Sequence, residues 1–225
     1  MRRLRPAVLV IVIASALIGA ASVQAVAQGV EITVLTSFDS GSPTAVAATN
    51  QGDIVALVGT DVVRVDPNGK QKPYETTISG GAFGIAIGIA YDGSHQLYAA
   101  LPGAFAPPPS GIHGILKISQ NGKQTTPVEG SDGMIAADAF GLDSATGDMY
   151  VSDIFGNAIW RFSRGGQAEL WTSDTTNPLL VGPDGVKVFE SAVYTSLGEG
   201  KVLRIPINPD GSAGTAEVWV EINEP

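Results

Sequence analysis

The chain contains no cysteine, and this absence removes several classes of protein at once. A disulfide, a thiolate metal site, a cysteine nucleophile and a lipid-modified cysteine anchor are all excluded. Basic residues are also few, with 13 Lys and Arg against 22 Asp and Glu, so the net charge is −9. Such an acidic chain disfavours binding to nucleic acid or anionic lipid; it favours a soluble secreted surface, and it also suits a cationic ligand such as a metal.

The common catalytic motifs are missing as well. The sequence has no G-x-S-x-G elbow, no phosphate-binding loop, no H-E-x-x-H pair and no D-x-D-x-D-G calcium loop. After the first 27 residues there is no run with helical periodicity, whereas 28 glycines and 14 prolines divide the chain at short intervals. These features predict an all-β protein made of many short strands.

The N-terminus has the pattern of an export signal. Three arginines, at positions 2, 3 and 5, precede an apolar run from Ala7 to Ala21, and small residues at Ala25 and Ala27 form an A-x-A cleavage site. The apolar run is shorter than a membrane-spanning helix requires. We therefore expect a signal peptide over residues 1–27, cleaved after Ala27 or Ala25, and a secreted or periplasmic domain over residues 28–225 that is not membrane-bound.

One unit of about 45 residues appears four times in the chain. Each unit has an apolar first strand, a second strand centred on Val or Tyr, a third strand of the form apolar-apolar-basic-apolar, a Gly-containing turn and a fourth strand. The second strands are centred on Val55, Tyr98, Tyr150 and Tyr194, and the third strands carry Arg64, Lys117, Arg161 and Arg204. Four strands in such a period are typical of a β-propeller blade.

The spacing is interrupted once, by a Pro/Gly-rich insertion from Pro102 to His113 in the second unit. We expect the basic residue of each third strand to face solvent. We expect the three tyrosines and Trp160 to pack between blades. Residues Glu31 to Phe38 read as one further strand, the outer strand of a closing blade.

Four units are fewer than the six blades we expect of the complete ring, which at this period would need about 270 residues. The sequence leaves three arrangements open: a chain lacking about two blades, a smaller closed ring, or a ring shared by two chains. The first is favoured, because an open stack exposes long strand edges.

The later units resemble one known family. Gly182-Pro183-Asp184-Gly185-Val186, with Asp138-Ala139-Phe140-Gly141-Leu142-Asp143 before it, resembles the senescence marker protein, gluconolactonase and luciferin-regenerating enzyme family. Similar blades occur in NHL-type propellers and streptogramin lyases. The resemblance implies a six-bladed propeller with a divalent metal, usually calcium, in its central channel.

The resemblance also suggests ligands for that metal. Asp184 stands where the family has a channel asparagine, and Asp138 stands where it has another. Gly41 stands where the family has its glutamate, and the family's last metal aspartate would lie beyond the four units. The resemblance thus implies a reduced metal site.

The residues themselves also indicate a cluster of acids. Because strand direction alternates within a blade, Asp138, Asp153, Asp184 and the 102–113 loop are expected on one face of the ring. Carboxylates that converge there are suitable ligands for Ca²⁺. We expect Asp138, Asp184 and Asp153 as metal ligands, with Asp184 and His113 as catalytic residues. Asp184-Gly185 can equally be read as a plain turn.

Two functions follow from these expectations. The first is a calcium-dependent hydrolase of lactone or ester type, acting on a small-molecule substrate. The alternative is a non-enzymatic propeller that binds a ligand or protein partner through the channel face, because a fold does not fix a function.

Overall fold

The computed structural model describes residues 34–39, 43–49, 51–78, 88–91, 96–102, 113–119, 125–164 and 166–222. The predicted signal peptide, Gly41 and most of the 102–113 insertion lie outside these residues. Within them the protein is all-β: the one helical turn is a short 3-10 segment, η1 (Ser131–Gly133), and no helix has the length and apolar character needed to cross a membrane.

Sixteen strands form four antiparallel sheets, each of four strands in sequence order. Blade 1 contains β1 (Pro43–Ala48), β2 (Ile54–Val58), β3 (Asp61–Val65) and β4 (Gln71–Thr77). Blade 2 contains β5 (Gly88–Tyr91), β6 (Leu97–Leu101), β7 (Gly114–Ile118) and β8 (Thr125–Pro127). Blade 3 contains β9 (Ala137–Leu142), β10 (Met149–Asp153), β11 (Ala158–Phe162) and β12 (Ala168–Ser173). Blade 4 contains β13 (Pro183–Phe189), β14 (Ala192–Leu197), β15 (Lys201–Pro206) and β16 (Glu217–Glu221).

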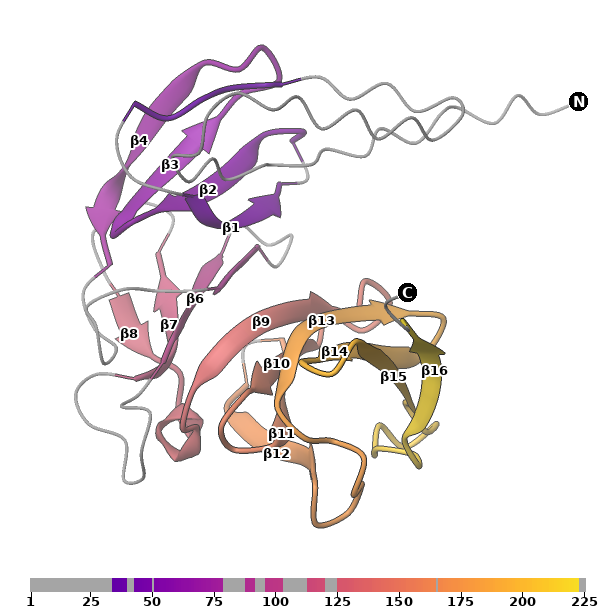
Figure 1. Cartoon of the computed structure of the whole chain (residues 1–225). Coiled ribbons are helices and arrows are strands. Elements are labelled where there is room, and N and C mark those ends of the chain that lie inside the picture. Colours follow the sequence, from indigo (N-terminus) through magenta and orange to yellow (C-terminus); the bar gives the residue numbers. More distant parts are fainter. Residues whose placement is uncertain are drawn as a thin grey trace, which may run out of the picture.

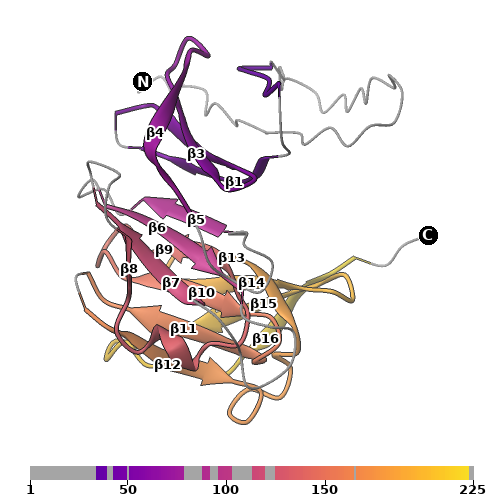
Figure 2. The same ribbon diagram turned by 90° about the vertical axis from the view of Figure 1, so that its left-hand side faces the viewer.

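The predicted four-blade repeat is therefore confirmed, and it matches part of a β-propeller. The sheets follow one another along the chain, from the indigo blade 1 to the yellow blade 4 (Figure 1; Figure 2). The first strands of successive blades contact one another, β1 with β5, β5 with β9 and β9 with β13, so they form the inner wall. Glycine permits this close approach at Gly141, where an added Cβ would lie 2.9 Å from Val186 Cγ1.

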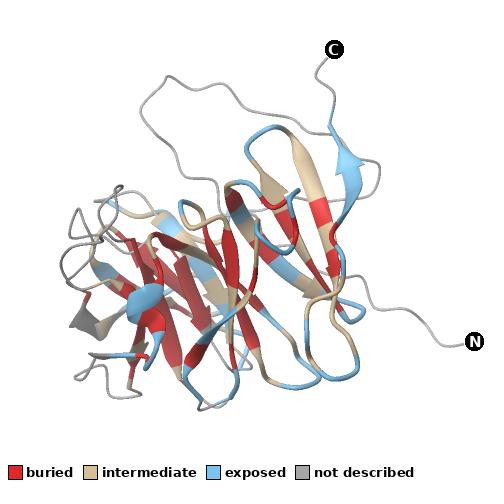
Figure 3. Ribbon diagram, turned by 90° about the horizontal axis from the view of Figure 1, so that it is seen from below, coloured by how far each residue is buried: buried red, intermediate tan, exposed pale blue. Residues whose placement is uncertain are grey.

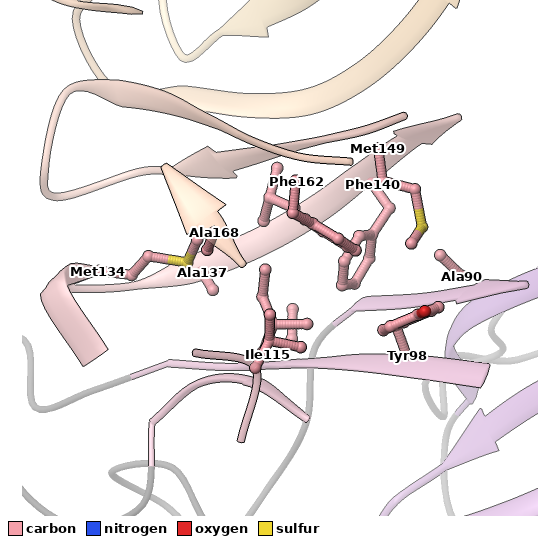
Figure 4. Close-up of a cluster of buried hydrophobic side chains, with 12 residues drawn as sticks. Ala90, Tyr98, Ile115, Met134, Ala137, Phe140, Met149, Phe162 and Ala168 are labelled. Carbon is pink, nitrogen blue, oxygen red and sulfur yellow. The ribbon is translucent and has the colours of Figure 1, made fainter. Parts of the chain in front are cut away.

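The apolar core lies between the blades. One cluster joins blade 2 to blade 3 and contains Tyr98, Phe140 and Phe162, whose rings lie 5.3 Å (Tyr98–Phe162) and 6.4 Å (Phe140–Phe162) apart (Figure 4). Trp160 packs against the same cluster. A second cluster joins blades 1 and 2, and a third, containing Tyr150, joins blades 3 and 4. The expectation that Tyr98, Tyr150 and Trp160 pack between blades is confirmed.

Two sequence expectations need correction. Arg161 does not face solvent: its guanidinium lies between blades 3 and 4, where it donates a hydrogen bond to the Gly211 carbonyl oxygen at 2.9 Å. Blade 4 brings a backbone acceptor to this position, which strand alternation alone does not reveal. Residues 34–39, from the strand predicted over Glu31 to Phe38, are not part of a β-ladder. They lie beside β4, where the Gln71 side chain donates to Thr36 Oγ1 at 2.9 Å.

Candidate functional site

The inner strands of blades 3 and 4 begin with equivalent acidic residues. In the strand registers, Tyr150 lies opposite Gly141 and Tyr194 lies opposite Lys187. Asp138 and Asp184 each lie three residues before those positions, on β9 and β13. The structure therefore brings together two of the predicted site residues from adjacent blades.

A serine from the second strand holds each of these strand starts in place. The pairing of β9 with β10 is irregular between Val151 and Asp153, and the Ala139 amide there donates to Ser152 Oγ at 3.0 Å. In blade 4 the Gly185 amide donates to Ser196 Oγ at 2.9 Å. Each serine hydroxyl oxygen accepts a hydrogen bond from the backbone amide of the residue that follows the aspartate. This repeated bond fixes the backbone on which each carboxyl is mounted.

Ser152 also links the two blades. Its buried hydroxyl donates to the Asp184 carbonyl oxygen at 2.5 Å while it accepts from the Ala139 amide. One side chain thus positions the residue after Asp138 and the backbone of Asp184 together. The carboxyl pair is consequently held by a fixed contact between blades.

The two carboxyl groups are hydrogen-bonded to each other. Burial, the hydrogen bond to Asp184 and the negative charge of Asp184 together raise the pKa of Asp138 to about 7, with burial the largest single cause. Asp138 therefore keeps its proton to a higher pH than an ordinary aspartate does. A cation placed between the two carboxyl groups would offset the electrostatic cost of ionising both of them.

One cation lies on the same wall. Lys187 is the single basic residue of the four inner strands, and its Nζ donates to the Phe140 carbonyl oxygen at 3.3 Å. Burial of the ammonium group lowers its pKa. All the Asp, Glu, Lys and Arg residues of the inner strands thus belong to blades 3 and 4, because β1 and β5 contain none.

Asp153 has different surroundings from the pair. Its side chain is buried, and its two oxygens accept hydrogen bonds from the backbone amides of Ile135, Ala136 and Gly156 at 2.8–2.9 Å. These bonds tie the segment before β9 and the turn after β10 to the end of β10. The geometry gives Asp153 a structural role, and its role as a metal ligand stays a prediction.

His113 lies immediately before β7, the third strand of blade 2, which the sheet order places two strands outward from the inner β5. Its Nε2 lies 3.0 Å from the backbone oxygen of Asp132, in the η1 turn. Its catalytic role stays a prediction. Within the described part of the chain, no group of three or more His, Asp or Glu side chains forms a ready metal site.

The sequence interpretation missed three contributors to this site, namely Ser152, Ser196 and Lys187. A usable signal existed for the serines, because Tyr150-Val151-Ser152 and Tyr194-Thr195-Ser196 repeat the same pattern. The corresponding residue of blade 2 is Ala100, two positions after Tyr98. The pattern thus separates blades 3 and 4 from blade 2.

Comparison with known proteins shows the fold. No protein-family model matches the chain, and no curated protein is similar to it in sequence. Among solved structures, a nidogen/laminin complex matches with a TM-score of 0.62 and 13% identity, over 84% of this chain and 68% of that one. A luciferin-regenerating enzyme matches with a TM-score of 0.57 and 11% identity, over 81% of this chain and 64% of that one.

A gluconolactonase from Xanthomonas campestris matches with a TM-score of 0.56 and 17% identity, over 77% of this chain and 60% of that one. The chain thus spans about two thirds of the length of these structures. Both of the protein types named by the sequence resemblance, lactonase and luciferin-regenerating enzyme, are among the structural neighbours. At these identities the likeness shows the propeller fold, and function has to be argued from the site.

Proposed function

We propose that the protein is an exported, calcium-dependent hydrolase of lactone or ester type, with its site at the Asp138–Asp184 pair. The observation that carries this proposal is the hydrogen-bonded contact between two carboxyl groups from adjacent inner strands, one of which has a pKa near 7. Such a pair is destabilised when both groups are ionised, and this state is what a divalent cation stabilises.

The residues present fit a cation only in part. Asp138 and Asp184 would hold it through hard carboxylate oxygens, which Ca²⁺ prefers. A cation held there would act as a Lewis acid toward a carbonyl oxygen of the substrate. Ser152 would keep the two carboxyls at a fixed separation, and Lys187 would attract the carboxylate of an acidic substrate or product. With two carboxylates, binding should be weaker than at a site of three or four.

Calcium titration of the full-length protein at pH 8 tests the metal step. At a calcium concentration about ten times Kd, binding should stabilise the fold by about 1.4 kcal/mol, which is a rise in Tm of a few degrees. Asp184→Asn should lose this rise. Asp132→Asn removes the same charge from an exposed residue of η1, the turn between blades 2 and 3, and it should keep the rise.

Hydrolysis of a sugar δ-lactone, measured with and without a chelator, tests the chemistry. Chelator-sensitive hydrolysis that Asp184→Asn abolishes would support the proposal. A calcium response without any hydrolysis would favour the second candidate, a ligand-binding propeller. That candidate is supported by the small number of charged groups on the described inner strands. A chain that neither binds calcium nor hydrolyses the lactone would contradict the hydrolase assignment.

A further inference from the structure

Blades 3 and 4 carry the same four side chains on the sheet face that is directed toward the next blade. In each blade a tyrosine from the second strand lies opposite an arginine of the third, and that arginine lies opposite a glutamate of the fourth, beside a tryptophan. The two sets are Tyr150, Arg161, Glu169 and Trp171 in blade 3, and Tyr194, Arg204, Glu217 and Trp219 in blade 4.

Their geometries also agree. The Tyr150 and Trp171 rings meet edge to face, 4.8 Å apart at 71°, and the Tyr194 and Trp219 rings do so 5.1 Å apart at 73°. The ion pair Arg161–Glu169 spans 2.9 Å, and Arg204–Glu217 spans 2.8 Å. The blade 4 set is thus preformed in the conformation that its counterpart adopts.

In blade 3 this set binds blade 4. Arg161 Nη1 and Trp171 Nε1 both donate to the carbonyl oxygen of Gly211, each at 2.9 Å, and Tyr150 is buried. Gly211 closes the Asn208–Gly211 turn between the third and fourth strands of blade 4, with a positive φ of 84°. Two N–H donors therefore converge on one backbone oxygen of the following blade.

In blade 4 the same set is uncovered. Trp219 is 59% exposed and Phe189 is 63% exposed, and all of β16 is exposed, as the pale blue strand in Figure 3 shows. Within the described residues, no acceptor is bonded to Trp219 Nε1. We call this surface, made by Tyr194, Arg204, Glu217 and Trp219, the open face.

We propose that the open face receives a further four-stranded blade, the next in the ring, and that Arg204 and Trp219 bind a glycine carbonyl in the turn before its fourth strand. Glu217 already neutralises Arg204, so the matching acceptor is an uncharged carbonyl and not a carboxylate. A large apolar surface beside this donor pair fits a packed sheet. The proposal is independent of the hydrolase assignment.

One position departs from the template. Lys187 stands where blade 3 has Gly141, against which β13 packs closely. The incoming inner strand therefore lies further from β13 than β13 lies from β9. This leaves more room beside Asp184 and Lys187 than exists beside Asp138.

A blade for testing this proposal can be made by duplicating part of the chain's own sequence. The registers make Glu221 of β16 equivalent to Ser173 of β12, because Lys201 pairs with Glu221 as Ala158 pairs with Ser173. A second copy of residues 174–221, joined directly after Glu221, therefore continues the chain as blade 4 continues from blade 3. The added blade brings its own copy of the Asn208–Gly211 turn to the open face.

Coverage of the open face can be read from a single thiol, because the chain has no cysteine. Val220 is 37% exposed, whereas its equivalent Thr172 in blade 3 is 4% exposed. In Val220→Cys, reaction with a thiol reagent should be at least tenfold slower in the extended chain than in the 225-residue chain. Adding Trp219→Ala to the extended chain should restore most of the fast rate.

A matched control separates docking from a general loss of reactivity. Leu170→Cys places a thiol at the blade 3 position equivalent to Val218, which is 54% exposed even though blade 4 is docked. Its rate should be the same in both chains. Equal Val220→Cys rates in the two chains, whether the added blade folds or not, would overturn the proposal. So would a dimeric 225-residue chain that already protects this thiol, because a second copy would then cover the open face.

Discussion

Asp138 and Asp153 lie on neighbouring strands of blade 3 and have opposite surroundings. The Asp153 carboxylate is buried and accepts three backbone amides. The Asp138 carboxyl is partly buried against a second carboxyl, and its pKa is raised to about 7. A buried charge whose hydrogen bonds are satisfied stabilises the fold, whereas one placed beside a like charge costs stability. The comparison gives Asp153 a structural role and leaves Asp138 as the residue on which the proposed site depends.

Removing Asp153 is the strongest way to break this comparison. Asp153→Ala leaves three amide donors without their acceptor, so the free energy of unfolding should fall by about 3 kcal/mol. Chemical denaturation of the full chain measures this loss. Asp143→Ala is the control, because Asp143 accepts from the Ala145 amide and Thr146 in a surface turn, and it should cost about 1 kcal/mol or less. Equal losses would remove the structural role given to Asp153.

Ser152 offers a test of intermediate size. Ser152→Ala removes the acceptor of the Ala139 amide and the donor to the Asp184 carbonyl, and should cost about 1–2 kcal/mol. Ser196→Ala removes the equivalent bond to the Gly185 amide, and within the described residues Ser196 Oγ has no hydrogen bond to another blade, so the cost should be about half as large. Calcium binding should weaken in Ser152→Ala more than in Ser196→Ala. The reverse order would contradict the link that Ser152 makes between blades.

The pH dependence of stability is the smallest and most specific test. A carboxyl whose pKa is raised on folding binds its proton more tightly in the native state, so stability falls as pH rises from about 4 to about 7 and then levels off. Asp138→Asn should remove this contribution. At pH 8 the variant should therefore be more stable than the original chain. The gain should be only about 1 kcal/mol, because solvent screens the half-buried carboxyl group. Thermal melts at pH 5 and pH 8 measure the difference.

Asp184→Asn sharpens the same test. Burial is the largest single cause of the raised Asp138 pKa, followed by the hydrogen bond to Asp184 and then by the charge of Asp184. The variant should therefore keep part of the fall in stability between pH 4 and pH 7. If the stability of Asp184→Asn depended on pH as little as that of Asp138→Asn, Asp184 rather than burial would be the dominant cause of the raised Asp138 pKa.

The repeat could be predicted because its signals are local. Positive-φ glycines such as Gly69 and Gly211 close turns within a few residues, and apolar alternation defines the strands between them. The equivalence of Asp138 and Asp184 also follows from the period, so their meeting on one wall was accessible from the sequence. These features depend on neighbours in the chain or on a regular repeat of them.

The tertiary structure decided what each polar group contacts. Asp153 is satisfied by amides 17 and 18 residues before it, through the irregular start of β9, and no pattern of residue types encodes that approach. Arg161 belongs to a strand position that reads as exposed, yet it binds a carbonyl 50 residues later in the chain. Polar side chains take partners from whichever backbone the fold brings within hydrogen-bonding distance, because leaving them buried without one is costly. The sequence by itself therefore determined the blades and their acidic residues, and blade packing determined which acid accepts backbone amides and which lies beside a second carboxyl group.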